Sequence, residues 1–149
     1  MTQSPESPPR YYTVHEANEL LPDVRKWLRR LRLALDGLRT IQKRLAADDE
    51  SVPTPEPDTL VDGDHFKTVV LFHDGLDNFR KRSIEVKDVD RGLIDFPAVD
   101  GDEEIRLCWL DGEASVSHYH DLETGFSGRK PIDGLSPEVR GLVDPDEDE

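Results

Sequence analysis

Two histidines in the last third of the chain have a spacing that suits metal binding. The sequence reads His118-Tyr119-His120-Asp121, and Glu123 follows closely. Side chains at positions i and i+2 of a β-strand project from the same face. Two imidazoles and one carboxylate on one face can hold a transition metal. His120 and Asp121 are therefore the candidate catalytic residues, with His120 as a proton carrier or ligand.

The third ligand of such a metal site depends on strand pairing. An Asp-Gly turn at Leu110–Glu113 places His120 opposite Glu103, which makes His118, His120 and Glu103 the candidate metal ligands. The alternative is that His120 only forms a hydrogen bond with Glu103 at the open end of a hairpin. We favour this alternative and expect no metal or other cofactor, with a divalent metal as the competing hypothesis.

A glycine-rich loop follows the histidines. Gly125 and Gly128 flank Phe126 and Ser127, and Arg129 comes next. Free backbone amides beside a guanidinium can bind a phosphate or carboxylate, so Gly125, Gly128 and Arg129 are candidate ligand-binding residues. Alternatively, Phe126 anchors the loop to the core while Arg129 pairs with an acid. The loop matches neither the P-loop nor the dinucleotide-binding pattern.

A β-meander is predicted to hold these residues. Asp-Gly turns in 99–102 and 110–113 separate strand-like runs, which is typical of tight hairpins and predicts three antiparallel strands over 92–120. One face of this sheet is apolar and the other mostly polar, as in a sheet that covers a helical layer. The same register places Cys108, the sole cysteine, on the face opposite both histidines, which excludes a Cys–His nucleophile within the sheet.

Three helices, one short and two longer, are predicted before the sheet. Thr13 and Glu16 have capping-box spacing, and Pro22 is expected to end a short first helix near Leu21. A long helix then carries an apolar heptad from Val24, and a second main helix spans 64 to about 86. Antiparallel packing of these helices gives an α+β fold: a helical hairpin, formed by the short N-terminal helix plus two main helices, with a three-stranded antiparallel β-meander.

Composition divides the chain. Residues 1–10, 48–63 and 133–149 are rich in proline and acidic residues and are predicted to be a disordered N-terminus, loop and acidic tail around one domain at 11–132. No apolar run suits a membrane span and no signal-peptide pattern begins the chain, which predicts a cytoplasmic protein.

Charge is also uneven. The net charge is −14, which disfavours general nucleic-acid binding. Residues 22–47 are nevertheless basic, with eight Lys or Arg against two Asp. This stretch is either a solvated helix face or a surface for an acidic tail, an acidic partner or an anionic surface.

Four segments together resemble a bacterial family of unknown function, numbered 2203. The resemblance covers about Tyr12 to Ile132, and the family usually has Trp-His where this chain has Tyr119-His120. His118 falls outside the core motif, and the resemblance implies no established activity. The four segments are YTVHEANELLP (12–22), VKDVDRGLIDFP (86–97), LCWLDGE (107–113) and YHDLETGFSGRKPI (119–132).

Two main functional hypotheses follow. The first is a non-catalytic interaction protein that binds a protein partner or forms a homo-oligomer through its amphipathic helices. The alternative is a small metal- or anion-dependent enzyme, hydrolytic in type, centred on His120 and the GFSGR loop. A third hypothesis is recognition of RNA or another anionic surface by the basic helix.

Overall fold

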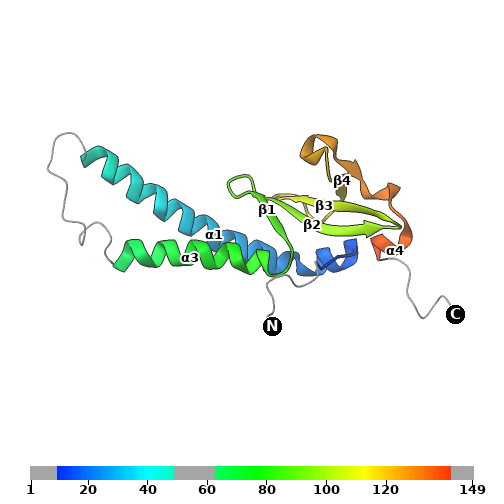
Figure 1. Ribbon diagram of the computed structural model, residues 1–149, viewed down its shortest axis with the longest axis horizontal. Helices are drawn as coiled ribbons and strands as arrows, with labels where there is room; N and C mark the ends of the chain where they lie inside the picture. Colours follow the sequence, from blue (N-terminus) through cyan, green and yellow to red (C-terminus); the bar gives the residue numbers. More distant parts are fainter. Residues whose placement is uncertain (1–9, 49–62, 142–149) are drawn as a thin grey trace.

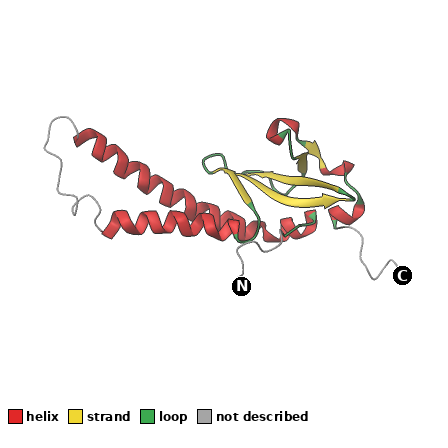
Figure 2. Cartoon of the chain, viewed as in Figure 1, coloured by secondary structure: helices red, strands yellow, loops and turns green. Residues whose placement is uncertain are grey.

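The computed structural model describes residues 10–48 and 63–141 (Figures 1 and 2). A long helix, α1 (Val14–Asp48), packs beside a shorter one, α3 (Gly63–Arg80). Helix α1 also continues beneath an antiparallel sheet whose five strands neighbour one another in chain order. The strands are β1 (Glu85–Asp88), β2 (Leu93–Asp100), β3 (Glu103–Leu110), β4 (His118–Asp121) and β5 (Lys130–Pro131).

The predicted fold is therefore wrong in its elements. There is one long helix where a short and a long one were expected, and the sheet has five strands instead of three. Helix α3 ends at Arg80, and residues 85 and 86, expected at the end of that helix, form the start of β1. Ser83 lies between them with φ 66°, a left-handed conformation that cannot continue a helix.

Helix α1 runs through Pro22 without ending. The capping box at its start is confirmed, because Thr13 and Glu16 exchange amide-to-side-chain hydrogen bonds of 3.0 Å. Proline inside a helix costs about 3 kcal/mol, but Pro22 is exposed while Leu21 and Val24 are buried on either side of it. The buried stripe thus continues across the proline and offsets the cost.

The hydrophobic core lies between the apolar face of the sheet and the first half of α1. The prediction that Ile94, Phe96, Ile105, Leu107 and Trp109 share one face is confirmed, since all are buried in one cluster. The cluster also contains buried residues of α1, namely Ala17, Leu21, Val24, Leu28 and Leu31.

Three arginines on α1, spaced seven residues apart, bind the loops of the sheet. Arg25 donates to the Ala114 carbonyl at 3.2 Å. Arg32 donates to two backbone carbonyls and forms an ion pair of 2.6 Å with Asp111, and Arg39 pairs with Asp90 through two contacts of 2.9 Å. Part of the basic stretch therefore anchors the loops of the same chain. This role differs from both the solvated helix face and the binding surface that were considered for this stretch.

The strand registers differ from the prediction in two ways. Asp100, not Val99, begins the β2–β3 turn opposite Glu103, a shift that preserves the faces. The turn from Leu110 to Glu113 forms as predicted, but β4 starts only at His118, and its pairing with β3 is shifted by about three residues, since Cys108 pairs with His118 where a tight hairpin would pair it with Ser115. The chain leaves the sheet here because the Val116 amide binds the Asn18 side chain at 2.6 Å.

The C-terminal end of the described chain also belongs to the domain. Leu135 and Val139 are buried, and the short helix α4 (Pro137–Arg140) contacts β2 and α1. Residues 133–141 are thus not part of an acidic tail. The other segments predicted to be disordered lie almost wholly at 1–9, 49–62 and 142–149, outside the described residues. None of the described helices combines the length and apolar character needed to cross a bilayer.

Candidate functional site

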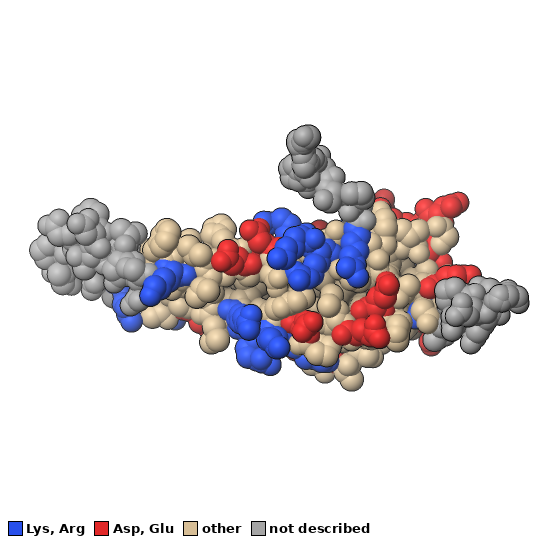
Figure 3. Space-filling model, turned by 90° about the horizontal axis from the view of Figure 1, so that it is seen from below, with Lys and Arg blue, Asp and Glu red and all other residues tan. Residues whose placement is uncertain are grey.

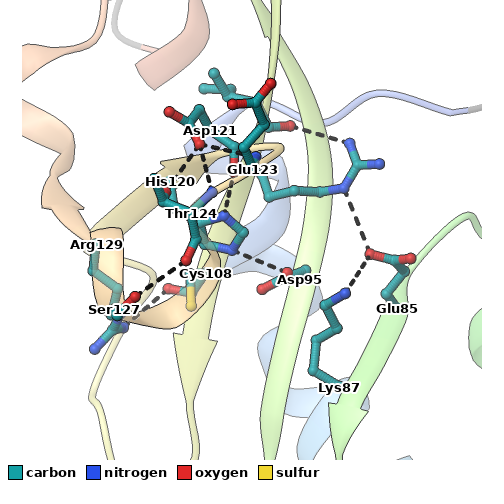
Figure 4. A network of polar contacts seen from close by, with 12 residues as sticks. Glu85, Lys87, Asp95, Cys108, His120, Asp121, Glu123, Thr124, Ser127 and Arg129 are labelled. Atoms are coloured by element: carbon teal, nitrogen blue, oxygen red, sulfur yellow. Dashed lines mark hydrogen bonds and ion pairs between the residues drawn. The ribbon is translucent and has the colours of Figure 1, made fainter.

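The polar face of the sheet holds three buried side chains from three successive strands. Asp95 lies on β2, Cys108 on β3 and His120 on β4, and their side chains converge (Figure 4). Asp95 and His120 are only 1% and 3% exposed. One donor atom of each residue lies within 4.8 Å of the other two. A carboxylate, a thiol and an imidazole are thus enclosed together.

The register of β4 explains why this cluster was not predicted. A two-residue hairpin would pair His118 with Ile105 and turn both histidines to the apolar face. The structure pairs His118 with Cys108 and His120 with Arg106. The two registers differ by an odd number of residues, which exchanges the faces of a strand. The predicted separation of Cys108 from the histidines is therefore wrong.

His120 is held by both ring nitrogens. Its Nδ1 lies 2.6 Å from the Asp121 carbonyl, and its Nε2 lies 3.0 Å from Oδ2 of Asp95. A carbonyl only accepts hydrogen bonds, so Nδ1 carries a proton. The Nε2–Oδ2 contact then holds one further proton, which leaves the pair neutral overall. Burial raises the pKa of Asp95, and the neighbouring His120 lowers it only in part.

The Cys108 thiol is not activated as a nucleophile. Burial, followed by the charge of Asp95, raises its pKa to about 12. The His120 Nε2 that could serve as its base is already bonded to Asp95. A cysteine nucleophile needs an accessible thiolate and an adjacent base, so thiol chemistry is not what this arrangement favours.

Arg129 covers the cluster from the loop. Its guanidinium donates to the Cys108 carbonyl at 3.2 Å and to Oε1 of Glu113 at 2.8 Å, and it stacks 4.8 Å from the Phe126 ring. Burial alone would raise the pKa of Glu113, but the hydrogen bonds from Arg129 and the Leu110 amide hold it below the usual value. This arginine already has an anionic partner within the chain.

Asp121 and the two glycines shape the loop over the cluster. Oδ1 of Asp121 accepts hydrogen bonds from the Glu123 and Thr124 amides and the Thr124 hydroxyl. The Thr124 amide is the main cause of the lowered Asp121 pKa. Gly125 has φ 64°, and a Cβ on Gly128 would lie 2.2 Å from Oγ1 of Thr124. These contacts give all three residues structural roles in the turn that leads into the 3-10 helix η1 (Gly125–Gly128).

The predicted metal set does not assemble. Glu103 is exposed and pairs with Asp100 at the β2–β3 turn. Nδ1 of His118 shares a 3.0 Å hydrogen bond with the Ser117 hydroxyl and lies 3.9 Å from Oε2 of Glu113. Of the three predicted ligands, only His120 reaches the buried cluster.

A second candidate site is the helical arm, defined here as the second half of α1, from Arg30, together with α3. It projects beyond the sheet (Figure 1). Leu33, Phe66 and Leu71 are 66%, 65% and 61% exposed on it. An open groove of about 970 Å³ runs between the two helices, and both Leu33 and Leu71 line it.

Charges of both signs border this groove. Arg30 comes from α1 and Asp74 from α3, both are exposed, and neither has an ion-pair partner among the described residues. Figure 3 shows basic and acidic side chains interspersed with uncharged surface over one face of the molecule. The heptad pattern indicated an amphipathic α1, but it did not indicate that Leu33 is exposed, because Leu33 lies outside the core positions of the heptad.

Comparison with known proteins gives a family and nothing closer. Residues 10–132 match the model of a family described as Uncharacterized conserved protein (DUF2203). No curated protein and no solved structure matches the chain. The matched range includes α1, α3, every strand of the sheet and the loop over the buried cluster. The chain therefore belongs to the DUF2203 family.

Proposed function

We propose that this protein is an interaction protein that associates with a second copy of itself through the helical arm. The observation that carries the proposal is the row of large apolar side chains on the arm. Leu33, Phe66 and Leu71 are each more than half exposed. Contiguous exposed apolar surface on a soluble domain is typical of a binding site.

A second copy is the occupant that this surface fits best. Two helices can bury one seam between them, whereas four can enclose a common core, which is the arrangement of a four-helix bundle. Association of two arms would convert two exposed apolar stripes into one such core. The apolar residues beside Leu71, namely Phe66 and Val70, extend the groove along α3 and lengthen the contact.

Charge complementarity favours a symmetric pair. In a two-fold dimer, if residue i of one copy contacts residue j of the other, then residue j of the first copy also contacts residue i of the second. The groove offers an unpaired cation on α1, Arg30, and an unpaired anion on α3, Asp74. A dimer in which each α1 lies against the partner's α3 places these opposite charges together twice.

Sedimentation equilibrium of the full chain tests this proposal. We expect a mass of twice 16.9 kDa for the wild type, and a single-chain mass for the Leu33→Glu/Leu71→Glu variant. Leu122→Glu is the matched control, because Leu122 is also exposed but lies on the loop outside the arm. This control is expected to stay dimeric. A monomeric wild type, or equal masses for all variants, would overturn the proposal.

A further inference from the structure

The buried polar cluster plays no part in the proposed association. Asp95, Cys108 and His120 lie on the sheet, beneath the segment that carries η1, and the groove of the arm is lined by other residues. Charged and polar groups are costly to bury unless each is satisfied. Three metal-binding side chains at one enclosed point therefore need an explanation of their own.

We propose that Asp95, Cys108 and His120 form a binding site for a divalent transition metal, with zinc the ion that fits best. The three residues offer one oxygen, one sulfur and one nitrogen donor, all within 4.8 Å of one another. Zinc accepts this mixture of thiolate, imidazole and carboxylate ligands. Calcium and magnesium prefer oxygen ligands alone, so the sulfur and the imidazole select against them.

One atom of the cluster is unsatisfied in a way that a cation would correct. Oδ1 of Asp95 is buried and has no hydrogen-bond partner among the described residues. The Cys108 thiol lies beside this carboxyl group and acts to lower its pKa, but its geometry toward Oδ1 does not make a hydrogen bond. An unpaired buried acceptor costs about 1–3 kcal/mol. Coordination of an ion by this carboxylate would remove that cost.

His120 is already oriented as a ligand. Its Nδ1–H donates to the Asp121 carbonyl at 2.6 Å, and a hydrogen bond from the far ring nitrogen to a carbonyl is the usual support for a metal-binding histidine. This bond fixes the tautomer and aims Nε2 at the carboxylate of Asp95, 3.0 Å away. The ion would take the place of the proton that the two groups share.

The charge balance also suits a divalent ion. Without metal, the His120–Asp95 pair holds one bridging proton and the thiol holds another, so the cluster is neutral. Binding of one divalent ion releases these two protons to solvent and leaves a thiolate, a carboxylate and a neutral imidazole around the ion. The cluster stays neutral overall. The nearby Arg129 forms an ion pair of 2.8 Å with Glu113.

Three ligands from the chain leave one position of a tetrahedral ion for water or another small ligand. This number of protein ligands is typical of a catalytic zinc ion, whereas structural zinc sites normally use four. The loop 122–129 covers this side of the sheet, and its own residues are exposed or only half-buried. Entry of the ion thus requires that loop to open, while the strands hold the ligands.

The test uses the full chain and needs no assumption about a substrate. Metal-free protein is titrated with zinc, and separately with cobalt, whose absorption spectrum contains an intense band only when a thiolate is a ligand. We expect one ion per chain, a cobalt–thiolate band and a higher melting temperature with zinc. Cys108→Ser is expected to weaken zinc binding by ~100-fold or more and to abolish the band.

His118→Ala is the matched control. It removes a histidine from the same face of the same strand but outside the ligand set, so binding is expected to stay within a few-fold of wild type. The cobalt band of the wild-type protein remains decisive if Cys108→Ser fails to fold. Absence of zinc and cobalt binding in the wild type would overturn the proposal. Binding without the thiolate band, or binding unchanged in Cys108→Ser, would overturn it equally.

Discussion

Along the helical arm the apolar side chains are exposed and the charges border them, whereas on the polar face of the sheet the charged side chains are buried and covered by a loop. Leu33 on the arm is 66% exposed, while Asp95 on the sheet is 1% exposed. Each region is incomplete by the usual rules of protein interiors. Among the described residues, nothing covers the exposed apolar side chains of the arm, and nothing forms a hydrogen bond with the buried Oδ1 of Asp95.

We therefore propose different ligands for the two regions. For the apolar groove with charges at its edge, the proposed ligand is another protein surface. For a buried cluster of three donor atoms, the proposed ligand is a single ion. The sheet and the first half of α1 form the scaffold that holds both sites, and the three anchoring arginines attach that scaffold to the loops.

The largest predicted effect comes from breaking the buried pair. Replacing His120 by Ala in metal-free protein leaves Asp95 without its partner, and removal of one member of a buried ion pair costs about 3–5 kcal/mol. Urea unfolding measures this loss. The double variant Asp95→Asn/His120→Ala is expected to lose less unfolding free energy than the two single variants lose when their losses are added. Additive single effects would mean that the two residues are not coupled.

The next largest loss of stability is expected when an anchoring arginine of α1 is removed. Arg32→Ala removes hydrogen bonds to two backbone carbonyls and the ion pair with Asp111, a loss of about 2 kcal/mol. Arg29→Ala, on the same helix but without an ion pair or hydrogen bond among the described residues, is expected to change stability by less than about 0.5 kcal/mol. Equal effects of the two substitutions in urea unfolding would contradict the anchoring role.

The close approach of the two helices is expected to depend on Gly75. A Cβ at this position would lie 2.8 Å from Cδ1 of Leu31, a buried side chain. Such overpacking costs about 1–3 kcal/mol, against a helix-propensity gain of about 1 kcal/mol. Thermal unfolding of Gly75→Ala should therefore show a net loss of about 1 kcal/mol. Stabilisation would mean that the helices have room to separate.

The smallest effect concerns the pH dependence of folding stability that arises from Glu113. The pKa of Glu113 is lowered in the folded protein, so its ionised form stabilises the fold above its ordinary pKa, and this stabilisation is lost as the pH falls through the folded value. Glu113→Gln is expected to cost about 1 kcal/mol at pH 7. Urea unfolding over a pH series should show the difference shrinking in acid. A constant difference would show that the charge is not responsible.

The sequence predicted the faces of β2 and β3 correctly, because alternation with period two does not depend on the exact turn. It failed for β4, since the turn at Leu110–Glu113 forms but the chain then leaves the sheet to reach Asn18. That contact spans almost a hundred residues and has no local signal. The sequence marked His120 as a candidate ligand, whereas its proximity to Cys108 required the correct register.

The helices show the same division between local and long-range information. The capping box at Thr13 was predictable because both partners are close in the chain. The continuity of α1 through Pro22 was not, because it depends on burial of Leu21 and Val24 against the sheet. The exposure of Leu33 was likewise invisible in the heptad pattern, since it depends on where α3 lies.

The most direct test of association through the arm is to mix two charge-reversal variants, Arg30→Asp and Asp74→Arg. Each variant alone brings like charges together twice in a symmetric dimer, so each is expected to dissociate more readily than the wild type in sedimentation equilibrium. The mixture restores both opposite-charge contacts, so a heterodimer is expected to form with near wild-type affinity. A mixture that dissociates like the separate variants would contradict pairing of α1 with the partner's α3.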